Sequence, residues 1–263
     1  MSELFQQAVA NTLPLLQSIE VGVKSTPKAS LAALKKLQAA AKAASPTPLM
    51  TREDTNTTPW TWSTLEKAIL SCQKCQNLVA SRTQVVFGVG NRDAELMFIG
   101  EAPGADEDKL GEPFVGRAGQ LLTKIIEAMG FTRDDIFIAN VLKCRPDMPA
   151  GESGNRKPRM DEMTTCLPWL REQIQLVKPR VMVALGATAA EGLLGETRPM
   201  RELRGQWLDF HSTPVMVTYH PAYLLRNQTI TEKRKVWEDM LLVLEKLGHP
   251  ISEKQRKFFT QAA

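Results

Sequence analysis

Four cysteines, and no others, constrain the fold of this chain more than any other feature of its sequence. Cys72 and Cys75 form a C-x-x-C pair, whereas Cys144 and Cys166 lie far downstream, on either side of a loop rich in proline, glycine and arginine. When the only cysteines of a chain form such a set, the pattern is typical of a four-thiolate metal site. We therefore predict that the fold brings these distant segments together around one metal centre.

The cysteines also have three alternative interpretations. Free cysteine is frequently a small buried side chain, but the C-x-x-C pair lies in the polar run 71–77 and Cys144 lies between two basic residues. Disulfides are the second alternative. Residues 1–20 lack the basic start and short apolar core of a secretory signal, so we expect a cytoplasmic, reducing location that disfavours them. The third concerns the metal, because four thiolates fit zinc as well as an iron–sulfur cluster.

Composition sets wide limits on the class of protein. A length of 263 residues allows one domain of ordinary size plus additional material. The apolar content is sufficient for a core, yet no apolar run is long enough to cross a bilayer, so we expect a soluble protein without a membrane partner. A net charge of +4 tolerates a polyanionic partner without requiring one.

The first 58 residues differ from the rest of the chain in amino-acid composition and periodicity. Residues 29–44 are rich in alanine, leucine and lysine and predict a short helix. Residues 51–59 are polar and without periodicity, which is typical of a linker. We therefore predict an N-terminal arm over 1–58, helical and partly disordered, and a separate domain over 59–263.

Beyond Trp60, continuous apolar runs alternate with segments of helical spacing. Helical spacing occurs at 63–70, 117–129, 160–176, from 187 onward, and at 231–247. The apolar runs are 95–100, 136–142, 181–185 and 215–219. Runs without alternation indicate strands buried on both faces, and the strand–helix–strand order favours a parallel sheet. The pattern predicts a doubly wound α/β sandwich whose ligands bind beyond the carboxyl ends of the strands.

Polar residues follow each of these predicted strands. Glu101 and Glu107 follow the first, Asn140 lies at the end of the second, and His220 follows the fourth, while Phe114 lies in a glycine-rich loop. An amide offers a donor and an acceptor to a base edge, and a phenyl ring stacks on a ring face. An imidazole stabilises negative charge on a ring oxygen, and a carboxylate stabilises a cationic sugar. Each motif alone fits a turn, a helix start or a core amide, but their convergence at strand ends predicts a site for a planar polar ring.

These motifs together resemble one family over residues 65–247, the family 4 uracil-DNA glycosylases, the bacterial and archaeal type with an iron–sulfur cluster. The resemblance implies an α/β/α three-layer sandwich with a four-stranded parallel sheet, a [4Fe–4S] cluster on the four cysteines, and a catalytic domain that removes uracil from DNA. The motifs that carry it are Cys72-x-x-Cys75, Gly100-Glu101-Ala102-Pro103-Gly104, Gly111-Glu112-Pro113-Phe114-Val115-Gly116, Asn140 with Lys143-Cys144-Arg145-Pro146, Asn155-Arg156-Lys157-Pro158 leading to Cys166, and His220-Pro221-Ala222-Tyr223-Leu224.

The resemblance also implies residue roles in catalysis. Glu101 and Glu107 correspond to the catalytic and water-handling carboxylates, and His220 to the imidazole that faces uracil O2. Ala102 lies at a base-binding position where family 1 enzymes carry an aspartate. Because alanine cannot replace that carboxylate, the resemblance implies that Glu101 contributes more to catalysis.

Three further roles follow from the resemblance. Phe114 corresponds to the stacking aromatic, Asn140 to the uracil-reading amide, and Leu224 to the residue that wedges into the duplex. Two segments depart from the family pattern, because the loop 147–154 is longer than in compact members and the arm 1–58 lies outside it.

The expected function is therefore a monofunctional hydrolase of base excision repair, acting on uracil in single- or double-stranded DNA of the nucleoid. Such an enzyme must flip the nucleotide out of the duplex at a cost of a few kcal/mol, and an apolar wedge fills the space that the nucleotide leaves.

The alternative functions are a metal-stabilised DNA-binding module without catalysis, a glycosylase that also accepts deaminated purines, and a small electron carrier. Candidates for phosphate contacts are Arg145, Arg156, Arg204 and Arg226.

Overall fold

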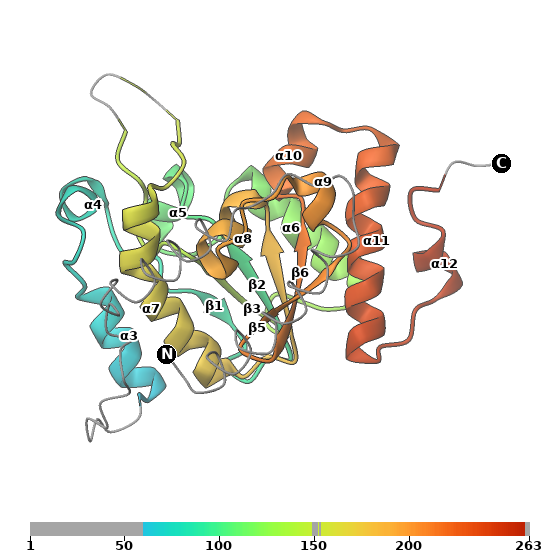
Figure 1. The fold of residues 1–263 in the computed structure, drawn as a ribbon, viewed down its shortest axis with the longest axis horizontal. Coiled ribbons are helices and arrows are strands. Elements are labelled where there is room, and N and C mark those ends of the chain that lie inside the picture. Colours follow the sequence, from blue (N-terminus) through green and yellow to red (C-terminus); the bar gives the residue numbers. More distant parts are fainter. Residues whose placement is uncertain (1–59, 149–151, 153, 261–263) are drawn as a thin grey trace, which may run out of the picture. The chain divides into compact units, whose positions relative to one another are not determined.

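The computed structural model describes residues 60–148, 152 and 154–260, shown in colour in Figure 1. The predicted N-terminal arm lies outside these residues. The boundary at residue 58 therefore stays a prediction.

A six-stranded sheet forms the centre of the described domain, in the order β1-β3-β2-β4-β6-β5. Neighbours among β3, β2, β4 and β6 are parallel, and the two edge strands are antiparallel to their neighbours. The four predicted parallel strands are thus confirmed, and two edge strands that the sequence did not predict extend them. The strands are β1 Val89–Gly90, β2 Leu96–Gly100, β3 Phe137–Asn140, β4 Val181–Leu185, β5 Trp207–Phe210 and β6 Thr213–Thr218.

Helices cover both faces of this sheet (Figure 1). The helices are α3 Trp62–Leu70, α4 Gln76–Ser81, α5 Ala105–Leu110, α6 Arg117–Met129, α7 Met160–Val177, α8 Ala187–Leu194, α9 Met200–Leu203, α10 Pro221–Arg226, α11 Ile230–Leu247 and α12 Glu253–Arg256. One core lies between the sheet and α3, α7 and α8, and the other lies between the sheet and α6 and α11. The predicted three-layer sandwich is confirmed, and it explains why every residue of β2 and β4 is buried.

The edge strand β5 pairs with β6 through a tight turn. His211 and Ser212 both have left-handed backbone, with φ of 50° and 70°. Two successive residues with positive φ are the requirement of a type I′ hairpin turn, which glycine and asparagine usually supply. Because neither occurs here, the sequence carries no recognisable hairpin signal.

No helix in the described part of the chain has the length and apolar character to span a bilayer. Cytoplasmic location stays a prediction.

Candidate active site

The carboxyl ends of the four parallel strands meet at one edge of the sheet, near α10 (Figure 1). The main chain keeps its pairing just beyond the strands, since Val141 N donates to Gly100 O (2.9 Å) and Leu142 N donates to Glu101 O (3.0 Å). On the other side, Gly186 N donates to Thr218 O (2.8 Å). The segments that carry Glu101, Asn140 and His220 are therefore fixed relative to one another by backbone hydrogen bonds.

Gly100, the last residue of β2, lies at the centre of the strand-end site, where the side chains of Asn140 and Phe114 approach its backbone. A Cβ atom at this position would collide with Asn140 Oδ1 and lie 2.6 Å from Cζ of Phe114. The rings of Phe114 and His220 lie 5.6 Å apart between centroids, at an angle of 32°. The predicted amide, aromatic and imidazole groups are thus brought together, and the absence of a side chain at Gly100 is what leaves them room.

Asn140 has a buried acceptor without a partner. The residue is 2% exposed, and its Oδ1 atom has no hydrogen bond within the described structure. An unsatisfied buried polar atom costs about 1–3 kcal/mol, so it requires an explanation. A ligand N–H group at this position would remove that cost.

Phe114 is held in an unfavourable backbone conformation, with φ of 55°. Arg133 anchors this loop because its guanidinium donates to Phe114 O (3.2 Å) and to Pro113 O (2.9 Å). Gly119 allows α6 to approach Phe114 so closely that a Cβ there would overlap the Phe114 carbonyl. A left-handed conformation costs roughly 1–2 kcal/mol for a residue with a Cβ, and these contacts offset that cost to fix the ring beside Gly100.

Glu107 uses both carboxylate oxygens to hold loops in place. One oxygen accepts from Gly104 N (3.1 Å), and the other accepts from Val115 N (3.0 Å) and Gly116 N (2.9 Å). The carboxylate therefore ties the start of α5 to the loop that follows Phe114. These contacts indicate a positioning role, and the predicted water-handling role of Glu107 stays a prediction.

Glu101 lies against the first turn of α8. Burial raises the pKa of its carboxyl, while a hydrogen bond from Thr188 and the charge of Lys157 oppose this increase. Lys157 in turn forms an ion pair with Glu191 (2.5 Å). Thr188 is a site residue that the sequence analysis missed, since it belongs to no polar motif, and Gly100 appeared there only as part of the motif 100–104. Ala102 beside Glu101 is half-buried and packs against the core on the α7 side.

His220 is the N-cap of α10, and its ring is neutral. Its Nδ1 atom accepts a hydrogen bond from Ala222 N (3.1 Å), which leaves the proton of the neutral ring on Nε2. Burial lowers the pKa of His220 to about 4, with a contribution from the Arg226 charge. At neutral pH the imidazole is therefore a hydrogen-bond donor without a positive charge.

Leu224 is 4% exposed and packs inside the protein, whereas Leu225 is half-buried and Arg226 is exposed. A wedge must reach beyond the protein surface. Leu224 can act as one only after α10 moves, so its role stays a prediction.

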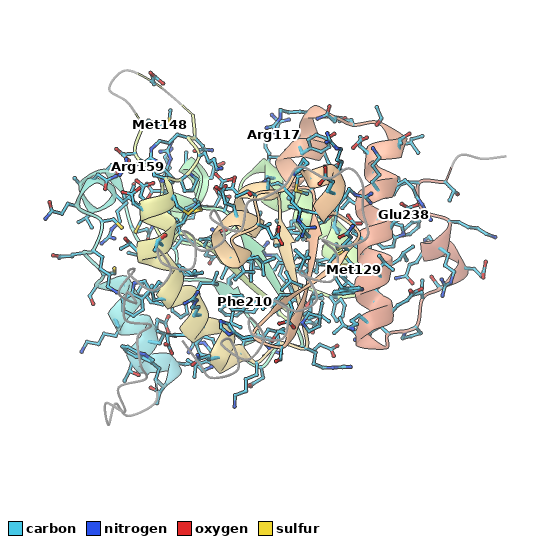
Figure 2. All side chains as sticks on the ribbon, viewed as in Figure 1. Arg117, Met129, Met148, Arg159, Phe210 and Glu238 are labelled. Carbon is cyan, nitrogen blue, oxygen red and sulfur yellow. The ribbon has the colours of Figure 1, made fainter. Side chains whose placement is uncertain are left out.

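Two of the predicted phosphate contacts are engaged elsewhere. Arg156 is bonded to Glu162 (2.7 Å) and to Asp147, and Arg204 is bonded to Asp239 (2.9 Å). Their guanidinium groups hold the protein together, so we correct the predicted role to a structural one. Arg226 is exposed, as is Arg117 at the start of α6, which lies beside α10 (Figure 2).

The four cysteines line one pocket beside α4 and α7. Cys75 is the N-cap of α4, Cys72 follows α3, Cys144 follows β3, and Cys166 lies within α7. Burial raises the pKa of the Cys166 thiol to about 12, so a bound metal would have to displace its proton. The predicted assembly of these cysteines is therefore present, although no regular element joins them.

Three N–H donors point to the sulfur atoms of this pocket. Arg82 Nη1 lies 3.0 Å from Cys144 Sγ, and Trp169 Nε1 lies 3.4 Å from Cys72 Sγ. The third donor is the main-chain N–H of Lys143, which lies 3.3 Å from Cys166 Sγ. An all-sulfur donor set with N–H groups directed at it fits a thiolate-bound metal centre.

The spacing of the cysteines bears on which metal centre fits. Among the described residues, no three His, Cys, Asp or Glu side chains come close enough to hold a single ion. Four sulfurs around one zinc would lie about 3.8 Å apart, given Zn–S bonds of about 2.3 Å. The ligand type alone still fits both one zinc ion and an iron–sulfur cluster.

Comparison with protein families matches residues 87–241 to the Uracil DNA glycosylase superfamily. A type-4 uracil-DNA glycosylase of Thermotoga maritima is 42% identical over 178 residues, which are 67% of this chain and 89% of that protein. A type-4 enzyme of Archaeoglobus fulgidus is 37% identical over 201 residues, 73% of this chain and 94% of that protein. A type-5 enzyme of Pyrobaculum aerophilum is 28% identical over 189 residues, covering 59% of this chain and 80% of that protein. The family match contains Glu101, Asn140 and His220, whereas Cys72 and Cys75 lie before its first residue.

Proposed function

The chain belongs to the uracil-DNA glycosylase superfamily and to its type-4 enzymes, and from this premise we propose how its residues excise uracil from DNA. It is a DNA repair glycosylase that hydrolyses the N-glycosidic bond of deoxyuridine and leaves an abasic site. The observation that carries the proposed mechanism is the unpaired, buried Oδ1 atom of Asn140 between Gly100 and Phe114.

Asn140 selects the base. Its Oδ1 accepts from uracil N3–H, and its amide NH2 donates to uracil O4. Cytosine has no N3–H and presents an amino group in place of O4, so both hydrogen bonds are lost. Phe114 stacks on the flipped ring, and its fixed loop means that little ordering is required when the base enters.

His220 stabilises the leaving group. As the C1′–N1 bond breaks, its electron pair passes to uracil, and negative charge develops on O2. The neutral imidazole donates its Nε2–H to that oxygen and keeps the proton, because a preformed donor in a buried site needs no reorganisation.

Glu101 acts on the sugar side. A water molecule adds to C1′ and transfers its proton to the Glu101 carboxylate, which also stabilises the cationic sugar before the water adds. Burial raises the pKa of this carboxyl and makes it a better proton acceptor. Glu107 contributes by holding the loops on either side of α5.

Basic and apolar side chains on and beside α10 contact the DNA. The exposed Arg117 and Arg226 bind phosphates, and Arg145, which is half-buried and donates to Gly154 O (2.7 Å), is a further candidate. Leu224 fills the space left by the flipped nucleotide when α10 moves, and Leu225 is the alternative wedge that needs no movement. We propose both single- and double-stranded DNA as substrates, since the pocket contacts only the flipped base.

The four cysteines that line one pocket would hold a [4Fe–4S] cluster, which the likeness to type-4 enzymes supports over a single zinc ion. When bound, the cluster cross-links the segments around α4 and α7 and supplies structural support. Arg82, Trp169 and the Lys143 main chain hold its ligands in place.

The test is a glycosylase assay on single-stranded U, U:G, U:A and T:G oligonucleotides. We expect uracil release from the first three. Glu101→Gln and His220→Asn should each lower the single-turnover rate roughly ten- to a thousand-fold with little change in DNA binding. The matched controls are Glu127→Gln and His211→Asn, which change exposed side chains outside the pocket.

Two results would contradict parts of the proposal. Unchanged rates in both active-site variants would remove Glu101 and His220 from the mechanism. Release of hypoxanthine from an I:T oligonucleotide would show that the range extends to deaminated purines.

A further inference from the structure

We infer that Lys143 is a positioning residue that links the cysteine site to the base-reading residue Asn140. The inference rests on the proposed function for Asn140 and for the four cysteines. Lys143 lies between the two sites in sequence, three residues after Asn140 and directly before Cys144. No step of the proposed mechanism uses the side chain of Lys143.

The ammonium group of Lys143 lies in the protein interior. The residue is 2% exposed, and its Nζ donates to the main-chain oxygen of Asn140 (2.9 Å) and to Gln173 Oε1 (2.5 Å). Gln173 is itself fully buried and donates from Nε2 to Phe87 O (2.9 Å). The Lys143 side chain therefore fixes the backbone of Asn140 to α7 and to the segment before β1.

The charge of this ammonium has its counterpart at the cysteine site. Both hydrogen-bond partners of the ammonium are neutral oxygens, and the residue itself contacts the cysteine site, because its main-chain N–H lies 3.3 Å from Cys166 Sγ. A buried charge is costly unless an opposite charge accompanies it. A cluster bound by four thiolates is anionic, so cluster and lysine stabilise each other.

The main chain of Lys143 makes the second connection. Its N–H donates to Cys166 Sγ (3.3 Å), and its carbonyl accepts from Val86 N (2.8 Å). A loaded cysteine site would thus fix the Lys143 backbone directly and attract its ammonium group through the negative charge of the cluster. Lys143 in turn fixes the residue whose Oδ1 must meet uracil N3–H, and a displacement of about 1 Å in such a group lowers a rate about a hundred-fold.

The test variant is Lys143→Met, which keeps the length of the side chain and removes its donors and charge. We expect the single-turnover excision rate on a U:G duplex to fall roughly 10- to 100-fold. The preference for a duplex with 2′-fluoro-2′-deoxyuridine over the same duplex with thymidine should fall as well. The reduction potential of the bound cluster should become more negative, because a cation beside it is lost.

A second variant and a control distinguish the loss of the Lys143 contacts from a general loss of protein stability. Gln173→Leu keeps the charge of Lys143 but frees its side chain, so we expect a smaller fall in rate and in base preference, with little change in potential. Leu244→Ala creates a cavity on the opposite face of the sheet, near α11, and should lower stability without changing base preference or potential. If Lys143→Met does not fold, Gln173→Leu decides the positioning role.

The outcomes separate this inference from the proposed function. A Lys143→Met protein with parental rate, base preference and potential overturns the inference, as does a fall in rate with an unchanged potential. If the parent protein releases no uracil, the proposed function fails, and the shift in potential still tests the link between lysine and cluster.

Discussion

The strand-end pocket and the cysteine site assemble distant residues in different ways. In the pocket, Asn140 and His220 follow parallel strands whose register is fixed by backbone hydrogen bonds. At the cysteine site, the thiols come from a turn, a helix N-cap, a strand end and a helix interior, and no common element joins them. Backbone hydrogen bonds of the sheet therefore hold the strand-end site, whereas at the cysteine site the proposed cluster would be the cross-link between the four segments.

Substitutions at the two sites should therefore have different effects. A change in the pocket leaves the sheet intact and should alter rate or base choice. A change among the cysteines removes a cross-link and should alter folding.

Cys75→Ala should lose the cluster and most of the folded protein, because metal binding and folding are coupled. The parent, purified anaerobically, should be brown with broad visible absorption. The measurements are iron content and the circular dichroism of the soluble fraction, with Ser81→Ala on α4 as the control. A colourless parent with one zinc ion, or a folded iron-containing variant, would contradict the assignment.

Asn140→Asp should lower uracil excision at least tenfold and leave the iron content unchanged. An ionised carboxylate offers acceptors only, so it repels uracil O4 and matches the cytosine amino group. Trace release of cytosine from a C:G duplex is therefore expected. Single-turnover rates on uracil and cytosine substrates test this, with the exposed Asn91→Asp as the control. A parental rate on uracil would show that Asn140 does not read the base.

Acid should destabilise the parent more than His220→Asn. Because burial lowers the pKa of His220 from 6.5 to about 4, the unfolded state takes up a proton that the folded state refuses between these values. Stability is therefore lost as pH falls from about 6.5 to about 4, by roughly 3 kcal/mol. Urea unfolding of both proteins at pH 7 and pH 4.5 measures the difference. Parallel losses in the two proteins would contradict a buried neutral imidazole.

Leu224→Ala and Leu225→Ala should identify the wedge. The true wedge variant should lose about tenfold in excision from duplex DNA while keeping its rate on single strands, since only the duplex leaves a gap to fill. Leu224→Ala should also destabilise the protein by about 2–4 kcal/mol, because this side chain is buried. A duplex-specific loss in Leu225→Ala alone would remove Leu224 from this role.

Deleting residues 1–58 should have the smallest effect, with excision and iron content unchanged. The arm lacks every motif of either site, so its lysines should add only salt-sensitive DNA binding. Binding across a salt series compares the full-length and shortened proteins. A shortened protein that does not fold would place the arm within the catalytic domain.

The sequence predicted the parts of the fold that depend on continuous burial. The four parallel strands are apolar on both faces, and α6 spans the predicted residues because Gly130 ends it with left-handed backbone. The edge strands escaped prediction because β1 is two residues long and the β5–β6 turn lacks glycine.

The candidate site was predictable where a polar residue follows a strand. Glu101, Asn140 and His220 were found in this way. Thr188 and Arg133 were missed because their roles depend on tertiary contacts with segments far away in sequence. The burial of Leu224 also escaped prediction, since a six-residue helix gives too short a pattern to show which face turns inward.

The short antiparallel edges of the sheet affect how copies of this protein meet one another. Without β5, the apolar six-residue strand β6 would present unpaired N–H and C=O groups to any neighbouring chain. With β1 and β5 in place, the outermost strands are two and four residues long. A second molecule can therefore extend the sheet by only a few hydrogen bonds, which discourages edge-to-edge aggregation in a crowded cell.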